Sequence, residues 1–190
     1  MEDFKKIAII GRRGQTVIVK TNLTNYQLIG KGWHGAVFKL SDERCVKIYA
    51  SEIVAEAEVA AYKRIKGAII CPTIYEVGPN YIVMEYIEGI TLRNYLKRKN
   101  DISETIAREI LLLLQEMKKL GFTDIDFNLN NVIVTKNNIL RLIDIVNGFK
   151  KRKRIPTALF KGLKELGLED LFIEQVRKID YNAYLEMKSN

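Results

Sequence analysis

The chain is poor in the residues that build nucleophilic triads, metal sites and disulfide frameworks. Its 190 residues include one histidine, His34, and two cysteines, Cys45 and Cys71. His34 lies at the tip of a glycine-containing loop, too isolated to build a His-based triad or a metal site, and the cysteines lack metal-ligand spacing. Both cysteines lie among apolar residues, so we expect buried, reduced thiols in a cytoplasmic protein.

Long apolar runs are also missing. No stretch of about 18 apolar residues occurs, and the first residues, MEDFKK, contain no apolar signal region. We therefore expect neither a membrane span nor secretion. Hydrophobic residues make up 47% of the chain, so it can bury a full core as one domain or as two small lobes.

Acidic residues are absent from one stretch of the second half. Residues 149–164 contain seven Lys or Arg and no acid, which leaves the rest of this +8 chain nearly neutral. Within the stretch, Lys150–Arg154 is a run of five cations. A solvated loop and a binding surface for an acidic protein or RNA explain such a run about equally well. Few aromatic residues lie nearby, so base stacking is not indicated.

Hydrophobic periodicity predicts an α+β fold with a β-rich part, residues 1–88, and a helical part, residues 89–190. In the first part, Ser51 is expected to cap a helix that ends at Gly67. In the second part, Asp101 and Glu104 resemble a capping box at the start of a helix that ends at Gly121. Strands are expected at residues 5–10, 16–20, 27–30, 36–40, 45–49, 74–77, 81–86 and 139–143, and later helices at 157–166 and 169–178.

Three glycines, Gly30, Gly32 and Gly35, have the spacing of a phosphate-binding loop. In a dinucleotide-binding unit these glycines open a helix. Here Val37 lies in a strand, followed by the polar turn SDER and a second strand. A glycine-capped hairpin is typical of the loop that covers phosphates in protein kinases. An isolated match is better explained as a turn in which glycine supplies a positive φ.

A lysine inside an apolar strand, Lys47 in CVKIY, is the next unusual feature. Burial of an ammonium group without a partner costs several kcal/mol, so the lysine needs an anion unless its strand lies at a sheet edge. The following helix offers Glu56 and Glu58. Helical periodicity places Glu58 on the apolar face and Glu56 on the polar face, so Glu58 is the predicted partner of Lys47.

A third polar set lies in the stretch from residue 121 to residue 148. Asp126 and Asn131 are five residues apart, and Asp144 follows a predicted hairpin. Asn and Asp side chains supply the hard oxygen ligands that Mg²⁺ requires, and a further carboxylate can accept the proton of a hydroxyl group. Each residue alone could equally be a turn former.

Taken in order, these elements resemble the protein-kinase-like superfamily over about residues 27–147. The compact chain looks most like small atypical members, such as the RIO and Bud32-like kinases, or small prokaryotic serine/threonine kinases. The resemblance implies a compact two-lobe fold, with an antiparallel sheet plus helix in the N-terminal lobe and a reduced, helical C-terminal lobe. It also implies transfer of the γ-phosphate of ATP to a hydroxyl acceptor, with serine or threonine of a protein expected.

The resemblance assigns a role to each site residue. Catalysis falls to Asp126, Lys47 and Glu58, and the metal, Mg²⁺ or Mn²⁺, falls to Asn131 and Asp144. The expected ATP-binding residues are Gly30, Gly32, Gly35, Val37, Lys47, Met84, Glu85 and Ile87. The alternative is a pseudokinase or scaffold that binds nucleotide and associates with RNA or an acidic partner through Lys150–Arg154.

The sequence departs from the kinase pattern at several positions. His-Arg-Asp reads Asp124-Ile125-Asp126, so regulation through a phosphorylated activation loop is not expected. Asn128 replaces the usual phosphate-contacting residue two positions after the catalytic aspartate. Asp-Phe-Gly reads Asp144-Ile145-Val146, and Ala-Pro-Glu is absent. A peptide-docking platform of the usual kind is therefore not expected.

Overall fold

A computed structural model of the chain describes residues 3–12, 14–150 and 155–188. Its backbone contacts divide the chain into two units. The N-terminal unit comprises Met1–Gly67 and Pro72–Ile87, and the C-terminal unit comprises Ala68–Cys71 and Glu88–Asn190. The fold is α+β, with an antiparallel sheet and helix first and a small helical part second.

The N-terminal unit contains a five-stranded antiparallel sheet in the order β3-β4-β5-β7-β6 and a separate hairpin, β1–β2. A short 3-10 helix precedes the hairpin, and the helix α1 follows β5. The elements are η1 (Asp3–Lys6), β1 (Ile7–Arg12), β2 (Gln15–Asn22), β3 (Gln27–Lys31), β4 (Gly35–Lys39), β5 (Arg44–Tyr49), α1 (Glu52–Arg64), β6 (Ile74–Gly78) and β7 (Tyr81–Glu85).

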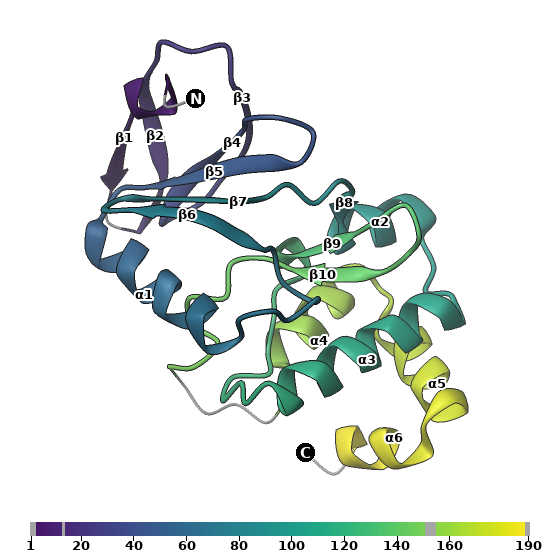
Figure 1. Ribbon diagram of the computed structural model, residues 1–190. Coiled ribbons are helices and arrows are strands. Elements are labelled where there is room, and N and C mark those ends of the chain that lie inside the picture. Colours follow the sequence, from purple (N-terminus) through teal and green to yellow (C-terminus); the bar gives the residue numbers. More distant parts are fainter. Residues whose placement is uncertain (1–2, 13, 151–154, 189–190) are drawn as a thin grey trace. The chain divides into compact units, whose positions relative to one another are not determined.

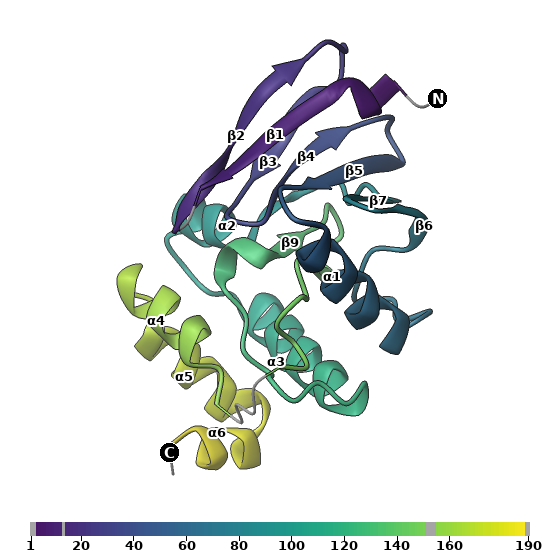
Figure 2. The same ribbon diagram turned by 90° about the vertical axis from the view of Figure 1, so that its left-hand side faces the viewer.

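Alternation along β4, β5 and β7, the three central strands of the five-stranded sheet, gives them two buried faces. Ala36, Phe38, Val46, Ile48 and Val83 form a cluster with the residues Phe4, Ile7 and Val17 of the hairpin region. Since successive side chains of a strand point to opposite faces, the intervening residues lie on the other face, where α1 contacts β5 and β7. Figures 1 and 2 show the β1–β2 hairpin over one face of the sheet and α1 on the other.

The C-terminal unit is mainly helical, with one small sheet in the order β10-β9-β8. The helices α3 and α5 pack side by side (Figure 1). The elements are β8 (Ile90–Thr91), α2 (Leu92–Lys99), α3 (Glu104–Lys119), η2 (Leu129–Asn131), β9 (Val132–Val134), β10 (Leu140–Leu142), α4 (Thr157–Glu165), α5 (Glu169–Ile179) and α6 (Tyr181–Lys188).

The start of α3 differs from the capping box expected at Asp101. Ser103 is the N-cap, and its side chain accepts a hydrogen bond from the amide of Ile106. Asp101 instead accepts from the amide of Ile102, one residue away. A serine directly before the first helical turn satisfies the N3 amide, whereas Asp101 lies two residues too early.

Among the described residues, no helix combines the length and the apolar character that a membrane crossing requires. Both cysteines are buried, as expected. Burial is the main cause that raises the pKa of each thiol to about 12, with Glu85 adding to the effect at Cys45. The thiols therefore stay protonated and unreactive at neutral pH.

Candidate active site

The glycine loop joins β3 to β4 as a tight turn. The amide of Gly32 donates to the carbonyl oxygen of Gly35 at 2.9 Å. Gly35 is buried, and a Cβ atom there would collide with the carbonyl oxygen of Ile48. A Cβ atom at Gly30 or Gly32 would instead meet no atom within 4 Å. Packing thus accounts for glycine at position 35 and leaves the space beside Gly30 and Gly32 open.

Lys47 and Glu58 form the predicted ion pair. The Nζ atom of Lys47 lies 2.7 Å from Oε2 and 2.9 Å from Oε1 of Glu58. Glu58 is 0% exposed and Lys47 is 8% exposed. Glu56, by contrast, is exposed on α1. Lys47 also lies over the ring of Tyr49, with Nζ 5.1 Å from the ring centroid. The periodicity of α1 therefore identified the correct carboxylate.

Strand register places further predicted residues on the face that carries Lys47. Val37 pairs with Lys47 across β4 and β5, and Cys45 pairs with Met84 across β5 and β7. Opposed residues of antiparallel strands point to the same side, and so do residues two apart on one strand, such as Cys45 and Lys47 on β5. Val37, Lys47 and Met84 therefore share one face of the sheet. Met84 is 6% exposed.

Some backbone groups at the end of β7 and in the connector that follows it already form hydrogen bonds within the N-terminal unit. The amide of Glu85 donates to the carbonyl oxygen of Thr73, and the amide of Tyr86 donates to that of Glu43. The carboxylate of Glu85 accepts from the amide of Thr73 at 3.0 Å. Glu85 therefore has a structural role, and Ile87, which is half-buried, ends the unit.

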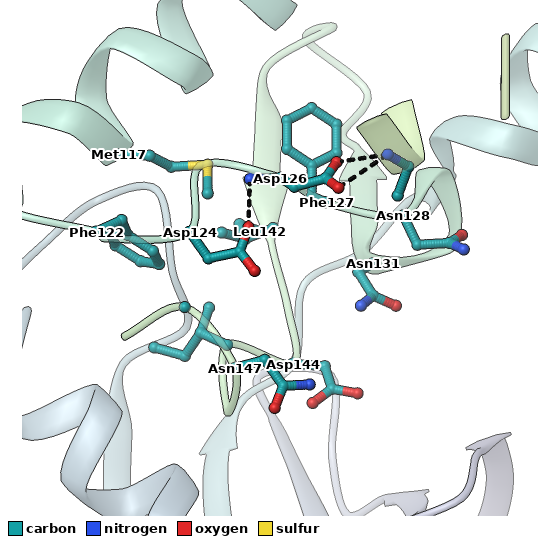
Figure 3. Close-up of a pocket in the computed structure, with 13 residues that line it drawn as sticks. Met117, Phe122, Asp124, Asp126, Phe127, Asn128, Asn131, Leu142, Asp144 and Asn147 are labelled. Atoms are coloured by element: carbon teal, nitrogen blue, oxygen red, sulfur yellow. Dashed lines mark hydrogen bonds between the residues drawn. The ribbon is translucent and has the colours of Figure 1, made fainter. Parts of the chain in front are cut away.

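In the C-terminal unit, Asp126, Asn131 and Asp144 line one pocket of about 180 Å³ (Figure 3). The β9–β10 hairpin explains why residues 13 positions apart in sequence meet. Leu142 pairs with Val132, and the amide of Ile143 donates to the carbonyl oxygen of Asn131 at 2.7 Å. Asn131 and Asp144 therefore lie at the same end of the hairpin.

Asp144 has a backbone conformation that is unusual for a residue with a side chain. Its φ is 59°, in the left-handed region. This conformation costs about 1 kcal/mol in residues other than glycine, although Asp and Asn tolerate it best. Strain of this kind is concentrated at functional sites, where it fixes the direction of a side chain.

The carboxylate of Asp126 makes contacts that the sequence did not lead us to expect. It accepts hydrogen bonds from the amide of Ala158, 2.8 and 2.9 Å from its two oxygens, and from the amide of Leu159 at 3.3 Å. The hydroxyl of Thr157 donates to it at 2.9 Å. Asp126 thus satisfies the first amides of α4 in the way that an N-cap residue does (Figure 3).

Two neighbours of Asp126 have local roles. The side chain of Asn128 accepts from the amide of Asn130 at 2.9 Å and so caps η2. Asp124, 7% exposed, accepts from the amide of Asp126 at 3.0 Å and fixes the backbone of the loop. Both residues also line the pocket.

In the described part of the chain, no group of three or more His, Cys, Asp or Glu side chains could hold a metal ion. The expected pair, Asn131 and Asp144, contains one residue of that kind, so a metal there would need further oxygen ligands from water or phosphate. The run Lys150–Arg154 lies outside the described residues except for Lys150.

Comparison with known proteins identifies the family. The family model described as "RIO domain" matches residues 11–158, which is more than half of the chain. This chain is a member of the RIO-domain family. The family lies within the protein-kinase-like superfamily, whose fold generally binds nucleotides.

Two bacterial relatives carry kinase names. The chain is 34% identical over 132 residues to "Putative serine/threonine-protein kinase YrzF" of Bacillus subtilis (strain 168), an alignment that covers 67% of this chain and 61% of the relative. It is 31% identical over 137 residues to "Probable serine/threonine-protein kinase CA_C1728" of Clostridium acetobutylicum, covering 61% of this chain and 21% of the relative. The RIO-domain chain thus spans only part of each relative's length.

A solved structure supports the fold. WbdD, crystallised with a kinase inhibitor, matches with a TM-score of 0.57 and 19% sequence identity, covering 83% of this chain and 46% of WbdD. At this level of identity the match establishes a shared kinase-like fold.

Proposed function

We propose that this RIO-domain protein is an ATP-dependent phosphotransferase that transfers the γ-phosphate to a hydroxyl group, with serine or threonine of a protein as the acceptor. The buried pair of Lys47 and Glu58 carries the proposal. Burial of two charges is often no more stabilising than apolar packing of the same volume, so structure alone explains the pair poorly. A buried lysine held by one carboxylate can position a phosphate of ATP.

The other predicted residues of the N-terminal unit fit a nucleotide. The open space beside Gly30 and Gly32 leaves room for phosphates against the loop backbone. Val37 and Met84 supply apolar surface on the face that carries Lys47. The amides of Glu85 and Tyr86 are already used, and the carbonyl oxygen of Glu85 accepts from Sγ of Cys45 at 3.6 Å. We therefore assign the adenine edge to the backbone of Ile87 and to the second lone pair of the Glu85 carbonyl oxygen.

The residues of the C-terminal unit fit a hard divalent cation and a general base. Asn131 and Asp144 would hold Mg²⁺, or Mn²⁺, through oxygen atoms, and the bound ion would neutralise charge on phosphate oxygens. Asp126 would orient the acceptor hydroxyl and accept its proton. All three side chains line the same pocket.

A second function, a nucleotide-binding scaffold without transfer, is favoured by one observation. The carboxylate of Asp126 accepts hydrogen bonds from α4, and the side chain of Asn128 accepts one from η2. Both side chains would have to give up these bonds to contact a substrate. The two functions differ in whether ADP is released and phosphate appears on a protein.

Nucleotide binding tests the site directly. Asp144→Asn keeps a residue that tolerates a positive φ but removes the charge, so it should abolish Mg²⁺-dependent ATP binding while the melting temperature stays unchanged. Lys47→Ala should weaken ATP binding with or without Mg²⁺. Calorimetric titration measures both, and binding equal to the parent in both variants would refute the assignment.

A further inference from the structure

The general base proposed above already has a hydroxyl group beside it. The Oγ1 atom of Thr157 lies 2.9 Å from Oδ2 of Asp126 and donates a hydrogen bond to it. A general base must lie within about 2.6–3.2 Å of the atom whose proton it takes. Thr157 therefore stands in the position that an acceptor hydroxyl would occupy at Asp126.

The start of α4 holds this hydroxyl in place. Thr157 is the first residue of α4, and the amides of Ala158 and Leu159 bind the same carboxylate. Ala158 lines the pocket together with Asn131 and Asp144. Thr157 itself is exposed, so a phosphate group on its oxygen could be accommodated without disturbing the core.

We propose that Thr157 is a modification site, phosphorylated within the same chain at Asp126. This inference rests on the proposed phosphotransfer. Oγ1 of Thr157 forms a bond to the γ-phosphorus of a nucleoside triphosphate, and the bond from that phosphorus to the β–γ bridging oxygen breaks. The bridging oxygen keeps the electron pair and leaves with the nucleoside diphosphate. The proton of Oγ1 passes to Asp126 and then to water.

The modification would change the site that produced it. A phosphothreonine carries a charge of about −1.5 to −2 and has lost the hydroxyl proton that bound Asp126. Repulsion between the phosphate and the carboxylate would separate the start of α4 from Asp126. The carboxylate would then be available to the hydroxyl of an external acceptor, so phosphorylation of Thr157 would precede phosphorylation of other molecules.

Matched variants separate this inference from a purely structural role for the threonine. Thr157→Ser keeps a hydroxyl group at the first position of α4, whereas Thr157→Val removes it with little change in volume. Thr105, exposed in the first turn of α3, provides the control, because it lies at a helix start without contacting Asp126. Thr105→Val should behave as the parent does.

The first experiment incubates the full chain with ATP and Mg²⁺ and maps phosphate by peptide mass spectrometry. We expect phosphate at residue 157 in the parent, in Thr157→Ser and in Thr105→Val, and none there in Thr157→Val. The rate per chain should not depend on protein concentration. Phosphate confined to other residues, or a rate that rises with concentration, would overturn the inference and leave the proposed function standing. Failure of ATP to bind or turn over would overturn both.

A second experiment needs no nucleotide. Thr157→Asp places a carboxylate against Asp126, and hydrogen exchange of the Ala158 and Leu159 amides should become several-fold faster than in the parent. In Thr157→Val, which brings no charge, the two amides should keep their protection. Unchanged exchange in Thr157→Asp would show that charge at residue 157 does not release Asp126.

Discussion

The carboxylate of Glu58 has no access to solvent, and each of its two oxygens lies less than 3 Å from Nζ of Lys47. Removing one partner of a buried ion pair leaves the other charge uncompensated, at a cost of about 3–5 kcal/mol. The neighbouring Glu56 lies on the exposed side of the same helix. The two glutamates therefore form a matched pair for mutation.

Glu58→Gln should lower the melting temperature and weaken catalysis, because a neutral amide cannot compensate the charge of Lys47. Glu56→Gln should change the free energy of unfolding by less than about 0.5 kcal/mol, as surface substitutions usually do. Thermal unfolding and ATP turnover of the two variants measure the difference. A larger effect at Glu56 would mean that the face of α1 is wrongly assigned.

A positive φ has a different structural cause at Asp144 than at the other described residues that adopt it. Three described residues other than glycine have a positive φ: Asn100, Asn138 and Asp144. Asn100 ends α2, and Asn138 lies in the turn between β9 and β10, where left-handed residues are common. Asp144 lines a pocket with two other predicted site residues. The strain there is better explained by the direction of its carboxylate than by chain reversal.

At the scale of elements, the glycine loop contains glycines of two kinds. Gly35 allows β4 to lie close to the backbone of Ile48, whereas Gly30 and Gly32 border open space. Sequence spacing alone cannot separate these two kinds, because the pattern is the same for a turn and for a phosphate-binding loop.

Gly35→Ala should therefore destabilise the N-terminal unit by about 1–3 kcal/mol through overpacking. Gly32→Ala should leave the unfolding midpoint within error of the parent and reduce affinity for ATP, because its methyl group would occupy space that we assign to phosphate. Chemical denaturation and ATP titration of both variants measure this contrast. A stability loss at Gly32, or none at Gly35, would contradict it.

Local signals predicted most elements and missed those that depend on distant contacts. The long strands and α3 have clear periodicity, so their positions agree with expectation. The helix α2 follows β8 directly in a strongly basic segment, and neither was predicted. The start of α4 was placed correctly, but its capping group, Asp126, comes 31 residues earlier in the chain. No sequence window of helical length contains both residues.

At the scale of the whole molecule, chain order does not fully match the division into units. Residues 68–71 belong to the C-terminal unit although the strands β6 and β7 follow them. The carbonyl oxygen of Ile70 accepts from the amide of Leu142, and that of Cys71 accepts from Arg141. These contacts join residues about 70 positions apart. Composition could therefore indicate a β-rich part and a helical part, but it could not show that residues 68–71 belong to the helical unit.

Charge is the second property of the whole molecule, and its distribution leads to the last prediction. The cations of Lys150–Arg154 come six residues after Asp144 and two before Pro156-Thr157, and residues 145–164 contain no acid. Five adjacent cations repel one another, so we propose that the run binds a polyanion, either RNA or an acidic protein.

Replacement of all five cations by serine should abolish retention of tRNA or of an acidic peptide and leave affinity for ATP intact. Binding of the parent to duplex RNA should weaken with salt through counterion release, with a log–log slope of roughly −0.9 per phosphate neutralised. Lys97, Arg98 and Lys99, exposed on α2, provide a control cluster whose replacement by glutamine should leave retention unchanged. If the five-serine variant still binds tRNA and acidic peptide as the parent does at low salt, the proposal that Lys150–Arg154 binds a polyanion is wrong.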